Sequence, residues 1–289
     1  MTGFNRIGIL GANGMLGRAV AERCQTLGIE PRLLSETDID LSRPFKDSVV
    51  RELDVDAVMN CAAWTDVDGA ESAEDQATVI NGEGVGRLAK ACAVAGVPIV
   101  HYSTDYVFDG RATSPYATDH PRDPLNAYGR SKAVGEIALE QSDADWLCVR
   151  TSWLYAPWGK NFVLTMAKLL PERDDLKVVD DQVGRPTSAR QLAERSIAML
   201  RQGFRGMAHG TDGGECSWHE FACAIADSVG VETRPASCGS DAFPRPAKRP
   251  AYSVLDIRAS DDALGPARPW TDELASVLRE ASRSNGVQA

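Results

Sequence analysis

The sequence predicts an α/β fold built on a doubly wound parallel sheet. Strand-like and helix-like segments alternate through the first half of the chain, which is typical of strands joined by crossover helices. A glycine-rich turn at 11–17 separates the first strand-like segment from the first helical one. The chain has 289 residues, 43% of them hydrophobic, which is enough to bury a large α/β core.

The first half is expected to supply most of the sheet. Runs of apolar and β-branched residues predict strands at 6–10, 31–35, 57–61, 99–103 and 146–150. Apolar residues at helical spacing predict helices between them, at 15–27, 79–95 and 125–141.

The alternation loosens after Arg150. A Trp-, Pro- and Gly-rich stretch at 153–159 precedes a predicted helix at 161–170 and a strand at 176–179. Prolines in and beside 243–249 predict an irregular loop there. A predicted helix at 190–200 and strand at 207–211 would return to the sheet. We therefore expect a first domain at 1–152 and a smaller, interleaved α/β substrate region at 153–289.

Composition argues against several classes of function. The net charge of −10 would repel a nucleic-acid backbone, so no nucleic-acid partner is expected. No apolar run reaches the roughly 20 residues that span a bilayer, so no membrane role is expected. Seven scattered cysteines and the lack of a signal peptide indicate a reducing, cytoplasmic location. The four histidines show no zinc-like spacing, so no metal site is expected.

The turn at 11–17 has the spacing G-x-x-G-x-x-G. Glycines there allow a tight turn and a close approach of the backbone to a pyrophosphate, while the helix N-terminus supplies free N–H donors. Its place after the first strand predicts a Rossmann-type dinucleotide site in the domain 1–152. Glu36, Asp38 and Asp40 are candidates for the adenosine ribose. A carboxylate there favours NADH, but nearby Arg32 and Arg43 leave NADPH open.

Tyr128 and Lys132 are four residues apart in a predicted helix and therefore share one face. A cation near the phenol would stabilise its ionised form and fit it for proton transfer to a carbonyl oxygen. Ser103, Thr104 and Asp105 end a predicted strand at the ligand edge of the sheet, where a hydroxyl can reach the reacting oxygen. The small residues after Asn60 end another strand at the same edge and leave room for a cofactor ring. Asn81 is expected either to anchor a helix near this site or simply to cap one.

These motifs together resemble the extended short-chain dehydrogenase/reductase superfamily, and are most similar within it to the dTDP-4-dehydrorhamnose reductase family. The similarity covers nearly the whole chain in order. It is carried by 11–17, 60–65, 103–110, 128–132, 150–155, 161–162, 181–187 and 249–253.

The resemblance implies that NADPH or NADH reduces the C4 keto group of dTDP-4-dehydro-L-rhamnose to give dTDP-L-rhamnose. Tyr128 would donate the proton, Lys132 would lower the pKa of Tyr128 and hold the nicotinamide ribose, and Thr104 would hydrogen-bond the reacting oxygen. Thr104, Asp105, Trp153 and Arg249 are the expected contacts of the dTDP-sugar, with 181–187 beside Arg249. The residues expected at the cofactor are Gly11, Asn13, Gly14, Met15, Leu16, Gly17, Asp40, Leu41, Cys61, Ala62, Ala63, Thr65, Tyr128 and Lys132.

Three alternatives stay open. A dehydratase or epimerase of the same superfamily would share the cofactor turn, but dehydratases resemble Thr-Asp-Glu where this chain has Thr104-Asp105-Tyr106, so the eliminating acid/base pair is missing. A reductase of a related nucleotide-linked 4-keto-deoxysugar would look much the same. A regulatory subunit that binds a dinucleotide without turnover tends to lose catalytic groups that are present here. A homodimer is compatible with the sequence, which leaves the oligomeric state open.

Overall fold

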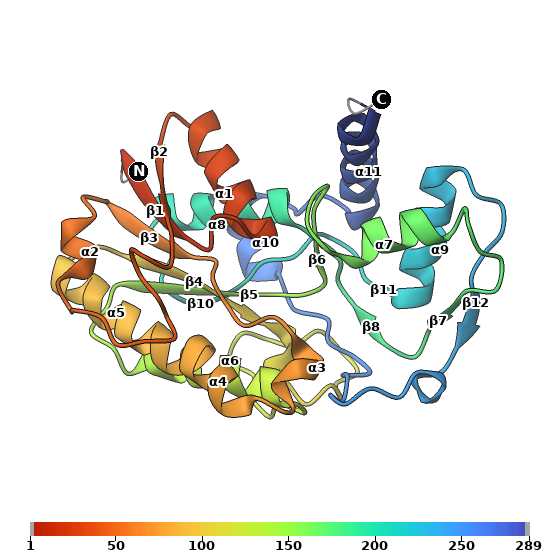
Figure 1. Cartoon of the computed structure of the whole chain (residues 1–289), viewed down its shortest axis with the longest axis horizontal. Helices are drawn as coiled ribbons and strands as arrows, with labels where there is room; N and C mark the ends of the chain where they lie inside the picture. The colour runs from red at the N-terminus through yellow and green to blue at the C-terminus, as the bar shows by residue number, and fades with distance from the viewer. Residues whose placement is uncertain (1–2, 287–289) are drawn as a thin grey trace.

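The computed structural model describes residues 3–286 and centres on a parallel sheet (Figure 1). Across the sheet the strands follow the order β2-β1-β3-β4-β5-β10, and every neighbouring pair is parallel. This doubly wound sheet confirms the predicted fold class. Its strands are β1 (Arg6–Leu10), β2 (Glu30–Leu34), β3 (Ala57–Asn60), β4 (Ile99–Thr104), β5 (Trp146–Thr151) and β10 (Gly206–His209).

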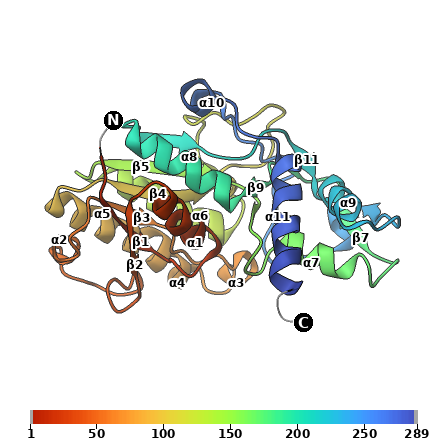
Figure 2. The same ribbon diagram turned by 90° about the horizontal axis from the view of Figure 1, so that it is seen from above.

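Helices cover both faces of the sheet. On one face α1 (Met15–Thr26) packs against α8 (Ala189–Arg201), and Figure 2 shows the two side by side above the strands. On the other face α5 (Gly84–Ala95) packs against α6 (Ala127–Glu140). Within 3–286, no helix combines the length and the apolar character needed to cross a membrane. The shorter helices are α2 (Val49–Glu52), α3 (Val67–Ala70) and α4 (Glu74–Thr78) beside α5 and α6, and α10 (Arg258–Leu264) beside α8.

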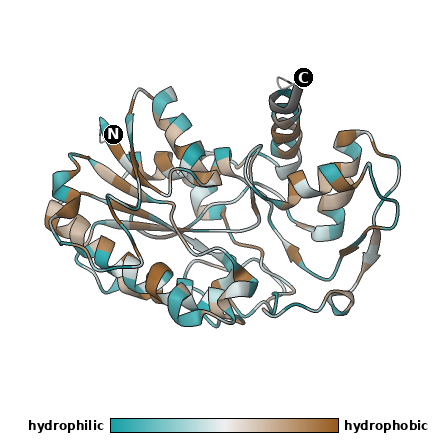
Figure 3. Ribbon diagram, viewed as in Figure 1, coloured by the Kyte–Doolittle hydropathy of each residue, from teal (hydrophilic) through white to brown (hydrophobic). Residues whose placement is uncertain are grey.

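Alternation along the strands divides the apolar residues between two cores. Ile7 and Ile9 of β1 pack with α1 and α8, whereas Leu10 packs with α5 on the opposite side. The edge strand β2 is largely exposed. Because both faces of β1, β3, β4 and β5 are buried, these strands read as nearly continuous apolar runs, and Figure 3 shows hydrophobic residues concentrated along the sheet. This double burial explains why strand positions were predictable from the sequence.

The strand order changes direction at β1. The chain passes from β1 to β2 on one side and then crosses back to place β3 on the other side of β1. Ligands of doubly wound sheets bind at the carboxyl ends of the strands beside such a switch point. Gly11, Cys61 and Asp105 directly follow the ends of β1, β3 and β4.

The second region holds short two-stranded sheets and three helices around a third apolar core. The strand predicted around Met207 lies in the main sheet as β10, beside β5. The elements of this region are β6 (Leu154–Tyr155), α7 (Phe162–Leu169), β7 (Lys177–Val179), β8 (Val183–Gly184), β9 (Thr187–Ser188), β11 (Cys216–Ser217), α9 (Trp218–Val229), β12 (Ala236–Cys238) and α11 (Trp270–Gly286).

The structure departs from the predicted elements at several places. The helix predicted at 79–95 begins as a π-helical turn, Val79–Glu83, which continues α4 into α5. The Trp-, Pro- and Gly-rich stretch 153–159, for which no element was predicted, contains β6, which pairs with the distant β9. Neither α9 nor α11 was predicted from the sequence. The capping box of α9, in which Ser217 and Glu220 bind each other's backbone, was a local signal that could have revealed it.

Candidate active site

The glycine turn brings three backbone segments into close contact. Gly11 has a φ of 76°, and a Cβ on it would lie 2.6 Å from the amide nitrogen of Ala62. A Cβ on Gly17 would overlap the carbonyl oxygen of Gly11. Only glycine allows α1 to start this close to the ends of β1 and β3. Gly14 precedes α1 without a side-chain cap, and the first turn of α1 holds no acidic residue, so its N–H groups can serve an anion.

A cavity of about 560 Å³ opens beside this turn, and we call it the glycine-loop pocket. Seven residues predicted at the cofactor line it. Glu36, a predicted ribose candidate, also lines it, together with Ser35, Thr37 and Ser42, whose hydroxyl groups were not predicted there. The lining consists of residues 10–14, 34–37, 39–42, 62, 63 and 80. Its walls therefore join the turn after β1 with the ends of β2 and β3.

The other residues predicted at the cofactor lie outside that lining. Met15 receives a hydrogen bond on its carbonyl from the Trp158 indole, at 3.2 Å, and Leu16 is buried in the core between α1 and the sheet. Cys61 donates its backbone N–H to Leu10 at 2.9 Å, and Thr65 is exposed. Direct contacts of these residues with a cofactor stay predictions.

Helix α6 presents Tyr128 in its first turn. Asn126 caps the helix by accepting the Gly129 N–H at 2.8 Å, and Glu71 accepts the Ala127 N–H at 2.8 Å. Tyr128 packs against the small cluster of Ala70, Ala77 and Ala127. Trp64 packs against the same cluster and directly follows the glycine-loop pocket residue Ala63. These contacts fix the tyrosine at the open end of the sheet.

The surroundings of Tyr128 make its phenol a weak acid. Burial, together with the charge of Asp105, raises the pKa of Tyr128 to about 12, and hydrogen bonding with Thr104 lowers it in part. Thr104 donates its hydroxyl hydrogen to Asp105 at 3.0 Å and accepts the Tyr106 N–H at 3.2 Å. Burial raises the pKa of Asp105 to about 7. Three predicted site residues, Thr104, Asp105 and Tyr128, thus form one interacting group.

Lys132 lies one turn further along α6 and is buried. Its Nζ donates to the Tyr102 carbonyl oxygen at 2.6 Å and lies 3.1 Å from His101 Nε2, while His101 Nδ1 lies 3.1 Å from Asn60 Nδ2. Burial lowers the pKa of Lys132 to about 8. The ammonium is therefore anchored on β4, and its predicted effect on the pKa of Tyr128 stays a prediction. The sequence analysis did not identify His101, because its partner is 31 positions away.

Asn81 serves as an anchor, one of its two predicted uses. Its side-chain oxygen accepts the Trp64 N–H at 2.9 Å, and its amide donates to the Trp64 carbonyl at 3.0 Å and to the Ser131 hydroxyl at 2.9 Å. Ser131 in turn donates to the Tyr128 carbonyl at 2.7 Å. The π-helical turn places this asparagine where it can tie the end of β3 to α6.

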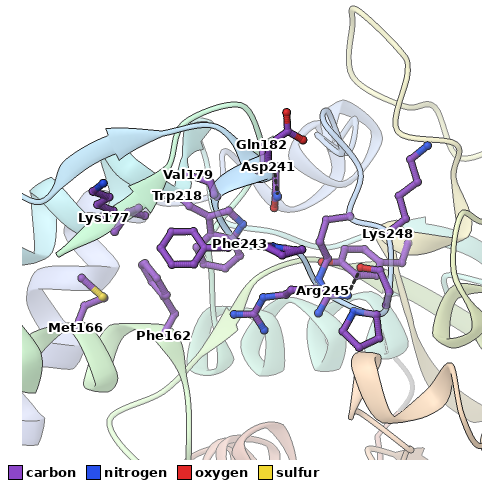
Figure 4. Close-up of a pocket in the computed structure, with 17 residues that line it drawn as sticks. Phe162, Met166, Lys177, Val179, Gln182, Trp218, Asp241, Phe243, Arg245 and Lys248 are labelled. Atoms are coloured by element: carbon purple, nitrogen blue, oxygen red, sulfur yellow. Dashed lines mark hydrogen bonds between the residues drawn. The ribbon is translucent and has the colours of Figure 1, made fainter.

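A larger cavity, of about 840 Å³, lies beside Tyr106 and between α7, α9 and the loop 243–249. We call it the aromatic pocket, because Phe162, Trp218, Phe243 and Tyr106 line it. Figure 4 shows Phe162 and Trp218 on one side and the loop residues Arg245 and Lys248 on the other. Its cationic lining residues are Lys177, Arg245, Lys248 and Arg249. Among the predicted substrate contacts, Arg249 lines this pocket, and the segment 181–187 contributes Gln182.

Trp153 lies behind the lining of the aromatic pocket. Its ring stacks on Trp218 with centroids 3.7 Å apart, and its φ of 46° is unusual for a residue other than glycine. Gly184 leaves room for the indole, since a Cβ there would lie 2.6 Å from it. Trp153 supports a pocket wall in this structure, and its direct contact with a sugar stays a prediction.

Comparison with known proteins agrees with this architecture. The family model for the RmlD substrate binding domain matches residues 5–283. The chain belongs to this family. The dTDP-4-dehydrorhamnose reductase of Burkholderia thailandensis is 41% identical to it over 295 residues, covering 95% of this chain and 98% of that protein. The dTDP-4-keto-6-deoxy-D-glucose reductase of Streptomyces niveus is 38% identical over 274 residues, covering 93% and 95%.

A solved structure of the same type matches over nearly the full chain of this RmlD-family member. The dTDP-4-dehydrorhamnose reductase from Bacillus anthracis, in complex with NADP, matches with a TM-score of 0.89 at 32% identity. The match covers 96% of this chain and 99% of that chain. The resemblance inferred from the motifs is therefore confirmed at the level of the family.

Proposed function

We propose that the protein is an NAD(P)H-dependent reductase that converts dTDP-4-dehydro-L-rhamnose to dTDP-L-rhamnose. One observation carries this proposal: Tyr128 lies between the two pockets. It shares the cluster of Ala70, Ala77 and Ala127 with Trp64, which follows the glycine-loop pocket residue Ala63. Its ring also lies edge-on to Tyr106 of the aromatic pocket, with centroids 6.0 Å apart. A proton donor in that place can serve a carbonyl that reaches in from one pocket toward a cofactor in the other. The names of the relatives support the choice of substrate.

The glycine-loop pocket fits a dinucleotide. Gly11 and Gly17 let the turn and the start of α1 pack directly against the ends of β1 and β3, because a Cβ at either position would strike backbone atoms. Gly11, Asn13 and Gly14 of this turn line the pocket beside the N-terminus of α1. The residues that would hold the pyrophosphate are those of the turn at 11–14, and Asp40 and Glu36, which line the same pocket, are the candidates for the adenosine ribose. When bound, the nicotinamide supplies the hydride.

The chain's own residues supply the proton and the electrostatic environment. With a pKa of about 12, Tyr128 stays protonated at neutral pH and can give its proton to the C4 oxygen of the sugar. Thr104 hydrogen-bonds with the phenol and lowers the pKa of Tyr128 in part. To stabilise the negative charge that develops as the proton leaves, Thr104 would turn its single hydroxyl hydrogen from Asp105 to the phenol oxygen. Lys132, held on β4 by Tyr102 and His101, supplies a nearby cation.

The aromatic pocket supports a nucleotide-linked substrate. Aromatic rings can stack on a base, and a diphosphate needs cations. Among the described residues that line the pocket, four are cationic and only Asp241 is a carboxylate, although the whole protein carries a net charge of −10. A neutral keto compound would gain nothing from such a lining.

The experiment that tests the function follows NADH and NADPH absorbance when the purified protein meets freshly generated dTDP-4-dehydrorhamnose. We expect oxidation by the wild type, and a loss of about 10²- to 10⁴-fold in kcat for Tyr128→Phe with NADH binding retained. Oxidation only with a related dTDP-linked 4-keto-6-deoxysugar would favour the second candidate, a reductase of that sugar, which the Streptomyces relative supports. Cofactor binding without turnover of any keto sugar would contradict both.

The cellular location and the oligomeric state of the protein are also proposed. We place the protein in the cytoplasm, because all seven cysteines are free thiols and a reductant such as NADH is supplied there. A homodimer stays a prediction, which light scattering of the purified protein would test.

A further inference from the structure

A single carboxylate of the first half of the chain makes three contacts with the loop 243–249. Asp68, in α3, lies 3.1 Å from Arg249 Nη2 and 3.2 Å from Arg245 Nη1 through its Oδ2. Its Oδ1 accepts the Ala247 N–H at 3.2 Å. Both oxygens of this side chain are thus used by a segment about 180 positions away.

The two arginines that Asp68 holds differ in exposure. The side chain of Arg249 is 17% exposed and that of Arg245 is 60% exposed, so the contact with Arg249 is the better shielded from solvent. Arg249 also lies over the Tyr106 ring at 5.9 Å and donates to the Ala247 carbonyl at 3.1 Å. The guanidinium of Arg249 is therefore fixed on several sides where it lines the aromatic pocket.

The charge of Asp68 is stable in this setting. Burial raises the pKa of Asp68, but the Ala247 N–H and the two guanidinium groups outweigh it and hold the pKa below its usual value. The cluster of one carboxylate and two arginines keeps a net charge of +1 for an incoming anion. Both partners of this cluster also contact the start of the catalytic helix α6. Glu71, three residues after Asp68, accepts the Ala127 N–H, and Asn126 donates to the carbonyl of Lys248 in the loop 243–249 at 2.9 Å.

We propose that Asp68 is a positioning residue that holds Arg249 and Arg245 in place for the diphosphate of a nucleotide-linked substrate. The inference rests on the proposed function, because it assumes that the aromatic pocket receives the nucleotide diphosphate. Asp68 does not touch the substrate. It lowers the cost of binding by ordering two long side chains before the anion arrives.

A positioning role and a competing role for Asp68 predict opposite signs. If Asp68 merely competed with the diphosphate for the arginines, neutralising it would release both cations and tighten binding. If it positions them, neutralising it weakens binding even though the local charge becomes more favourable to an anion. The sign of the change therefore decides between the two.

The test measures binding of dTDP by calorimetry, at one fixed ionic strength, to the wild type, Asp68→Asn and Glu74→Gln. Glu74, on the neighbouring α4, is the matched control. It pairs with Arg130 at 2.7 Å and lines neither pocket. We expect Asp68→Asn to raise the Kd for dTDP at least about tenfold and the KM for the keto sugar similarly, with kcat little changed, while Glu74→Gln stays within about twofold of wild type.

Other results of the dTDP-binding experiment would contradict the proposal. Equal or tighter dTDP binding by Asp68→Asn overturns the proposal, as does an equal loss in Glu74→Gln. If the loss in Asp68→Asn persists undiminished when Arg249→Ala is already present, the carboxylate does not act through that arginine and the proposal fails. Normal NADH binding by Asp68→Asn excludes general misfolding as the cause. If the wild type itself binds no dTDP, the proposed function falls together with this inference.

Discussion

Tyr128 is a weak acid in a site where Asp105 can add a negative charge. Because the charge of Asp105 raises the pKa of Tyr128, ionisation of Asp105 makes the phenol a poorer donor. The pKa of Asp105 is about 7, so this change falls within the working pH range. As the pH rises, the rate of the reaction should therefore change with the ionisation of Asp105 at a lower pH than with that of Tyr128.

We expect kcat for the reduction to fall as the pH rises through about 7. The decline should disappear in Asp105→Asn, which cannot ionise. A pH profile of kcat under saturating substrate checks both statements. An unchanged midpoint in Asp105→Asn would show that another group is responsible.

Asp105 also links stability to pH. Its pKa is about 7 in the folded chain and 3.8 without the fold, so the folded state binds more protons between these values. Its contribution to stability is complete below pH about 4 and is lost as the pH rises through 7. Urea unfolding at pH 5 and pH 8 should show a smaller difference in Asp105→Asn than in the wild type.

Glu36 and Asp40 should set the cofactor preference. Among the described residues that line the glycine-loop pocket, two are carboxylates and none is a lysine or arginine. Arg43, paired with Asp40, lies outside that lining. A 2′-phosphate would therefore meet like charge, and we expect kcat/KM to favour NADH over NADPH by about tenfold, or about 1.4 kcal/mol.

The ratio of kcat/KM for the two cofactors measures this preference. Glu36→Gln should narrow the ratio, whereas Glu52→Gln, a carboxylate change on α2 away from the pocket, should leave it unchanged. An NADPH preference in the wild type would contradict the expectation and point to Arg43 or Arg32 as a phosphate ligand.

At the scale of elements, α6 is held by a buried ion pair at its far end. Glu136 is fully buried and accepts hydrogen bonds from Arg150 Nε at 2.8 Å and Nη2 at 2.7 Å, and from Arg122 at 3.0 Å. Arg150 is itself buried on β5 and donates to the Thr118 carbonyl. The pair therefore joins the catalytic helix to the sheet.

Removing one charge of this pair should be costly. Glu136→Gln leaves the Arg150 guanidinium buried without its counter-ion, and we expect a loss of about 3–5 kcal/mol in the free energy of unfolding. Glu140→Gln is the matched control, because Glu140 bonds Arg122 at the surface and should cost less than about 1 kcal/mol. Urea denaturation of both variants checks the difference. Similar losses of unfolding free energy in the two variants would show that the buried Glu136–Arg150 pair contributes no more to stability than the surface pair.

At the scale of the whole molecule, the first half depends on the second for its core. Leu192 and Ile197 of α8 pack with α1 in the same cluster as Ile7 of β1, and β10 forms an edge of the sheet. A fragment that ends before α8 would expose this apolar surface. The boundary predicted at residue 152 therefore does not separate two independent folding units.

We expect the fragment 1–152 to show no cooperative thermal transition and no NADH binding. The fragment 1–211 adds α8 and β10 and should regain both. Circular dichroism and calorimetry on the two fragments check this. A cooperative transition in 1–152 would mean that the first half folds without the cover that α8 provides.

The strand positions, the glycine turn and the shared helix face of Tyr128 and Lys132 were readable from the amino-acid sequence alone. Each depends on local rules: strands buried on both faces read as apolar runs, close backbone approach requires glycine, and residues four apart share a helix face. A chain of family motifs in order then indicated the reductase family, which the comparisons confirmed.

Which distant groups meet became clear only from the folded chain. The contact of Asp68 with Arg245 joins residues 177 positions apart, and His101 reaches Lys132 across 31 positions. The stacking of Trp153 on Trp218 also depends on how the second region folds back. No local pattern encodes such pairs, because they form when separately stable elements pack together and their side chains fill the space that remains.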